Sequence, residues 1–190
     1  MSTRQRPPRA RRERDGSRPP TAAEARAAVE AERAANRERR AQQMRERFGD
    51  EVPGRAIIVA SWVATALFGV VSVPAVIDPE RFVALFFGVS VVLFFTGCAV
   101  FVLDLVLAAA RSRDDAMGIG GLFFLVGSAP RPVQVHLLGS LAAQVVVAVV
   151  AAALHPFTPL AFGTLVPTVA LSLCGLWAVR HGLFEPAAPE

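Results

Sequence analysis

Asp104 is the first residue whose chemistry stands out, because it is the single charge in the apolar run 82–110. An ionisable group inside a membrane helix is by default a candidate site for protons or ions. Its height indicates another role. A short turn places Ile77 and Phe82 at the same depth. Arg55 lies 22 residues before Ile77 and Asp104 lies 22 residues after Phe82. Both are therefore about 33 Å from the turn along their helices. We therefore predict an Arg55–Asp104 ion pair that closes a helical hairpin, with a proton relay or ion site as the alternative.

Gln144 is the second candidate, because a buried amide needs hydrogen-bond partners. Thr65, Thr96 and Thr168 lie at comparable depths in the other apolar runs. Interhelical hydrogen bonds of this kind contribute about 0.6–2 kcal/mol. We predict a structural role for these intramembrane polar groups, with a substrate pathway through Gln144 as the alternative.

The remaining side chains that could bind metal or catalyse show no recognised spacing. The three histidines, His136, His155 and His181, are dispersed, and no zinc, nucleotide or nucleophile motif occurs. A lipid-modifying enzyme would need a cluster drawn from Asp104, Asp114, Asp115 and His136. Cys98 and Cys174 lie in apolar runs and are expected to behave as small apolar residues. We predict no catalytic residue, no cofactor and no metal.

Four apolar stretches must position these residues: 56–77, 82–110, 135–154 and 160–179. A helix of roughly 20 residues crosses a hydrocarbon core of about 30 Å, and none of the four has a polar face. The sequence therefore predicts an all-α polytopic membrane protein with four transmembrane helices arranged as two hairpins.

A charged segment precedes the apolar body. Residues 1–20 are rich in Arg and Pro and are predicted to be disordered. A helix is expected over 21–48, where Thr21 and Glu24 form a capping box and Ala, Glu, Arg and Gln predominate. This helix is expected to be solvated or to lie on the membrane surface, with a coiled coil as a weaker option.

The arginines predict the orientation. All twenty basic residues are Arg, and only Arg81 lies in the short loops 78–81 and 155–159. The N-terminal tail, the connection 111–134 and the tail 180–190 hold the others. The positive-inside rule then places both termini in the cytoplasm. Within the connection, the short apolar run 122–126 should lie at the interface, re-enter the membrane or pack on the bundle end.

Small residues recur at four-residue spacing in two of the spans. Ser61, Thr65 and Gly69 follow this pattern in the first span, and Gly139 and Ala143 in the third. Such spacing is typical of closely packed membrane helices. We predict close helix contacts at these positions, either within the bundle or between copies of the chain.

The segments GIGGLFFLVGSAPRP, HLLGSLAAQVVVA and HPFTPLAFGTLVPTVALSLCGLWAVRHG make up about a third of the chain. This part resembles small four-span membrane proteins of actinobacterial type, to which no activity is assigned. The resemblance, like the Arg-, Ala- and Val-rich composition, implies a bacterial plasma membrane.

These features favour a non-enzymatic accessory, assembly or scaffolding component of a membrane complex. A small oligomeric transporter or channel is the alternative. Besides the bilayer, the expected partners of the Arg-rich arm are anionic headgroups or a cytoplasmic protein. Nucleic acid is not expected, because nine acidic residues stand among the arginines of residues 1–55 and no aromatic residue precedes Phe48.

Overall fold

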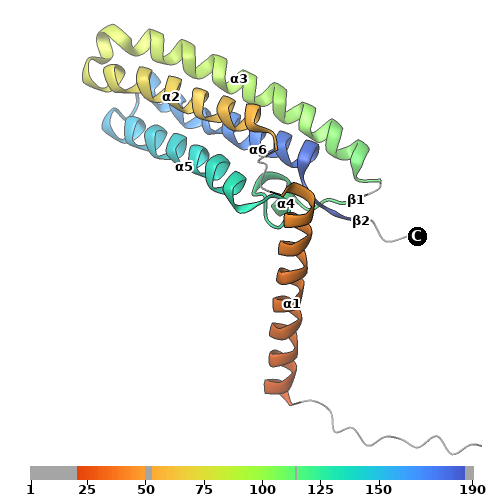
Figure 1. Ribbon diagram of the computed structural model, residues 1–190. Helices are drawn as coiled ribbons and strands as arrows, with labels where there is room; N and C mark the ends of the chain where they lie inside the picture. Colours follow the sequence, from red (N-terminus) through yellow and green to blue (C-terminus); the bar gives the residue numbers. More distant parts are fainter. Residues whose placement is uncertain (1–20, 50–52, 114, 187–190) are drawn as a thin grey trace, which may run out of the picture. The chain divides into compact units, whose positions relative to one another are not determined.

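The chain is an all-α polytopic membrane protein, as predicted. The computed structural model describes residues 21–49, 53–113 and 115–186, so the tail 1–20 lies outside the described residues. Four helical segments are long and apolar enough to cross a membrane (Figure 1). They are α2 (Arg55–Ile77), α3 (Pro79–Arg111), α5 (Arg131–Leu154) and a fourth segment, Pro159–His181.

The chain divides into two compact units, Met1–Arg39 and Arg40–Glu190. The first contains most of α1 (Ala22–Phe48), which buries none of its 27 residues. The predicted capping box is confirmed: the Thr21 backbone N–H donates to Glu24 Oε2 at 2.7 Å, and the Glu24 N–H donates to Thr21 Oγ1 at 3.3 Å. The hydrogen bond from the Thr21 backbone N–H lowers the pKa of the Glu24 carboxyl.

Two tight turns close the helical hairpins. In the first, Asp78 Oδ1 accepts from the Arg81 N–H at 3.3 Å and Pro79 begins α3. In the second, Thr158 Oγ1 accepts from the Leu160 N–H at 3.3 Å. Side-chain caps of this kind satisfy N–H groups that a helix start leaves without partners.

The fourth span is divided into a 3₁₀ helix, η1 (Pro159–Leu165), and α6 (Pro167–His181). Pro167 has no N–H to donate to the Gly163 carbonyl in an α-helical pattern. The Val166 N–H donates to that carbonyl instead, at 3.1 Å. Gly163 also permits close packing, because a Cβ there would lie 2.8 Å from the Phe86 ring.

The fourth span forms the centre of the bundle. Helix α6 contacts α2, α3 and α5, and Trp177 on α6 is fully buried. Large apolar side chains instead face outward on α2, α3 and α5, including Val70, Val92 and Val146. A surface of this kind suits a surrounding bilayer, whose hydrocarbon solvates apolar side chains.

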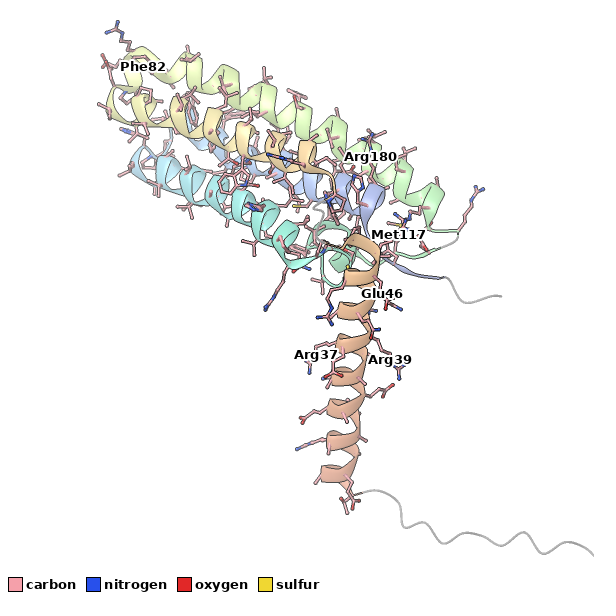
Figure 2. The ribbon with its side chains drawn as sticks, viewed as in Figure 1. Arg37, Arg39, Glu46, Phe82, Met117 and Arg180 are labelled. Atoms are coloured by element: carbon pink, nitrogen blue, oxygen red, sulfur yellow. The ribbon has the colours of Figure 1, made fainter. Side chains whose placement is uncertain are left out.

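One end of the bundle carries an arginine from each span: Arg55, Arg111, Arg131 and Arg180. We call it the arginine-rich end. Figure 2 shows Arg180 at this end of the bundle and Phe82 at the other. The short helix α4 (Ile119–Phe123) packs against α6, and β1 (Asp115–Ala116) pairs antiparallel with β2 (Glu185–Pro186).

Candidate functional site

Polar side chains join α2 to α5 inside the bundle. Ser61 Oγ lies 2.5 Å from Ser140 Oγ, and Gln144 Nε2 donates to Thr65 Oγ1 at 2.9 Å. Because the Ser140 hydroxyl donates to the Leu137 carbonyl, the Ser61 hydroxyl is the donor to Ser140. We call these four side chains the α2–α5 polar ladder. It links two spans through hydrogen bonds that hydrocarbon cannot replace.

The polar ladder also fixes the register of the two helices. Both of its pairs are separated by 79 residues, and so are His155 Nε2 and the Val76 carbonyl, which lie 2.9 Å apart. A constant separation means that α2 and α5 run parallel. The two hairpin turns therefore lie at the same end of the bundle, opposite the arginine-rich end.

Of the three threonines predicted as partners of Gln144, only Thr65 bonds to it. Thr96 is exposed on α3, and Thr168 is half-buried near the start of α6. Gln144 Oε1 is buried without a hydrogen-bond partner. The polar ladder therefore leaves one acceptor unsatisfied in the bundle interior.

We expect a double-mutant cycle of Thr65→Val and Gln144→Leu to give a coupling free energy of about 0.6–1.7 kcal/mol. Each substitution removes one partner of the same hydrogen bond, so the two losses should not add. The measurement is reversible unfolding in detergent. Thr96→Val, on an exposed site, serves as the control and should change stability little. Strict additivity would show that the Thr65–Gln144 bond contributes no stability.

Asp104 is fully buried on α3 and faces α6. Its Oδ2 lies 2.7 Å from the place that a Cβ would take at Gly175. Neither carboxyl oxygen has a hydrogen-bond partner, and Arg55 is exposed at the start of α2. The predicted Arg55–Asp104 ion pair is therefore wrong.

The error has a geometric cause. Counting residues along a hairpin fixes the height of a side chain, but the direction in which it points rotates by about 100° per residue. Helix α3 contacts both α2 and α6, and its phase turns Asp104 towards α6.

Arg111 is a structural residue that the sequence did not reveal. Its guanidinium donates to the Val179 carbonyl at 2.6 Å, to the Gly182 carbonyl at 3.0 Å and to Asp115 Oδ2 at 2.6 Å. It therefore ties the end of α3 to the end of α6, whose last carbonyls would otherwise lack donors. The sequence shows at this point only two arginines, Arg111 and Arg113, followed by two aspartates.

The connection between α3 and α5 packs on the arginine-rich end. Phe123 of α4 stacks on Phe101 of α3 with ring centroids 5.1 Å apart. Leu125 is fully buried with φ +58°, and Gln134 Nε2 donates to its carbonyl at 2.8 Å. A positive φ is rare for leucine, so burial and this hydrogen bond hold the turn.

Concave surfaces also lie outside the polar ladder, and two of them differ in polarity. A groove of about 450 Å³ runs between α2 and α5 near the hairpin turns, and its lining is almost wholly apolar, including Gly69, Val73, Val147 and Val150. A pocket of about 250 Å³ at the arginine-rich end is lined in part by Arg40, Gln43, Gly118 and Phe184. The first faces the hydrocarbon side of the bundle, and the second is polar.

Within the bundle, Gly69 and Gly139 make no close helix contact, and contact between copies of the chain stays a prediction. No heavy atom lies within 4 Å of a Cβ built at Gly69, and at Gly139 the nearest is Trp62 at 3.9 Å. The tight contact is at Gly97, where a Cβ would lie 2.7 Å from the Val169 backbone nitrogen. Ser61 does meet α5, but through its hydroxyl, while Ala143 is half-buried on α5.

The residues considered for a lipid-modifying cluster are not brought together where the structure describes them. His136 is exposed on α5 and Asp115 is paired with Arg111, while Asp114 lies outside the described residues. Cys98 is half-buried and Cys174 is buried, both as free thiols. The described residues contain no group of His, Cys, Asp and Glu that could hold a metal ion.

Among the described residues, this arrangement provides hydrogen bonds between spans, the buried carboxyl group of Asp104 without a hydrogen-bond partner, and the hydrogen bonds of Arg111 that join α3 to the end of α6. Comparison of the chain with protein-family models, curated proteins and solved structures finds no match.

Proposed function

We propose that this integral membrane protein is an accessory or scaffolding component of a larger membrane complex. In this proposal the bundle lies in a bacterial plasma membrane, and the arm α1 binds a cytoplasmic protein. The supporting observation is that α1 is regular along 27 residues and buries none of them. The part of α1 up to Arg39 belongs to a compact unit of its own. A helix with polar residues on all sides does not form a core, so this part offers its surface to another molecule.

The charge distribution supports a cytoplasmic arm. The four spans each carry an arginine at the arginine-rich end, whereas Arg81 is the one arginine of the described hairpin turns. This asymmetry follows the positive-inside rule. On α1, Arg37 and Arg39 project to different sides of the helix (Figure 2), so charge is available around it.

The bundle interior favours this role over the alternative, a small transporter or channel. The side chains of the α2–α5 polar ladder bond to one another in pairs, and Gln144 Oε1 is the one atom among them without a partner. A transport path needs polar groups that face a passage and exchange partners with the solute. The short hairpin turns add no domain at the opposite end.

We expect deletion of residues 2–39 to abolish co-purification of a stoichiometric partner from native membranes in mild detergent, without loss of membrane insertion. The deletion stops before Phe48, whose ring lies 6.2 Å from that of Trp177, so the bundle keeps that contact. Deletion of residues 2–20 alone is the matched control, because it spares α1.

The outcomes separate the possible roles. Loss of the partner with the longer deletion only would assign binding to α1. Loss of insertion with either deletion would mean that the segment acts in topology alone. A full-length chain that purifies as a solitary homo-oligomer would contradict the docking role and favour transport, to be tested by flux into liposomes.

A further inference from the structure

The connection between α3 and α5 exposes three large apolar side chains. Ile119 is 74% exposed, Phe124 is 51% exposed and Val126 is 67% exposed. Their neighbours Leu122, Phe123 and Leu125 are buried. The left-handed turn at Leu125 produces this alternation, because it directs Leu125 inward between two outward residues.

The height of this segment coincides with the edge of the hydrocarbon core. Phe101 lies about 28 Å along α3 from Phe82, and a core is about 30 Å thick. Phe123 stacks directly on Phe101 and would touch a Cβ at Gly175 of α6. Helix α4 is therefore level with the membrane boundary, neither deep within the bilayer nor far from it.

The surroundings of the segment match a lipid interface. Val135, in the first turn of α5, is also strongly exposed, so apolar surface continues from the connection onto a span. Arg113 and Arg131, at either end of the connection, are exposed. Apolar side chains flanked by cations are what an anionic headgroup layer accepts, with the apolar groups about 5–10 Å into it.

We propose that Ile119, Phe124 and Val126 form an interfacial anchor that inserts into the leaflet at the arginine-rich end. The anchor would hold this end of the bundle, with the hydrogen bonds of Arg111, at a fixed depth in the bilayer. Its partner is the lipid surface itself. The proposal is independent of the docking role of α1, since it concerns another segment.

The test measures depth in full-length protein reconstituted into vesicles of phosphatidylcholine and phosphatidylglycerol. The spin label is attached to Phe124→Cys in a Cys98→Ala background. The remaining native cysteine, Cys174, is buried and is left in place. The reaction of Cys174 with the spin-label reagent is measured in the background protein, which has no introduced cysteine. Matched labels at Arg113→Cys and Val102→Cys report the charged part of the connection and the lipid-facing side of α3, where Val102 is exposed.

We expect the label at position 124 to be relaxed by oxygen, as at position 102, and shielded from a water-soluble nickel chelate, unlike position 113. Ile119→Cys provides a second reporter and should behave in the same way. Nickel accessibility equal to that at position 113 would overturn the proposal, because the segment would face water. Protection from both reagents would also overturn it, because protein would then cover the patch.

Discussion

Gly97→Ala is expected to destabilise the bundle by about 1–3 kcal/mol, the usual effect of overpacking. The added Cβ would lie 2.7 Å from the Val169 backbone nitrogen and 2.8 Å from its Cα. These are main-chain atoms of α6, so no side-chain rotation can relieve the overlap. Helices α3 and α6 would have to separate, which would loosen the core around the most buried span.

The control for this prediction is another glycine of the same bundle. Gly69 and Gly88 have no heavy atom within 4 Å of a Cβ position, so Gly69→Ala and Gly88→Ala should be neutral or slightly stabilising, as alanine favours helix over glycine. The measurement is the denaturant midpoint of each variant in the same detergent. Equal midpoints for Gly97→Ala and Gly69→Ala would contradict the close α3–α6 approach.

Asp104→Leu is expected to stabilise the protein by about 1–3 kcal/mol, the cost of leaving a buried polar group without a partner. Leucine branches at Cγ as aspartate does, and it carries no group that needs hydration. The sign of this change in stability is informative, because an ion pair with Arg55 predicts destabilisation. If that pair existed, removing Asp104 would leave a cation without its partner and destabilise the bundle.

The control substitution is Arg55→Gln. Arg55 is exposed, and a surface change away from special contacts alters stability by less than about 0.5 kcal/mol. Both variants are compared by reversible unfolding in detergent. Destabilisation by both substitutions, to similar extents, would support the Arg55–Asp104 ion pair after all. Stabilisation by Asp104→Leu together with loss of the protein's role in cells would mark Asp104 as a residue retained for function at a cost in stability.

The features decided by the sequence are those that depend on short stretches of chain. A run of about 20 apolar residues has few stable alternatives to a membrane helix, so the four spans could be recognised directly. The capping box of Thr21 and Glu24 joins residues three apart, and local backbone geometry is enough to form it. The need of Gln144 for a partner likewise follows from its type alone.

Tertiary structure decided which neighbour each helix face meets. Asp104 turned towards Gly175 rather than Arg55, and Gln144 bonded to one threonine of three. Gly97, which has no small residue four positions away on either side, became a tight contact with the α6 backbone. Arg111 reaches carbonyls 68 and 71 residues away. Rotation about a helix axis changes these contacts without changing any height or hydropathy, so only the packing of all four spans together could select them.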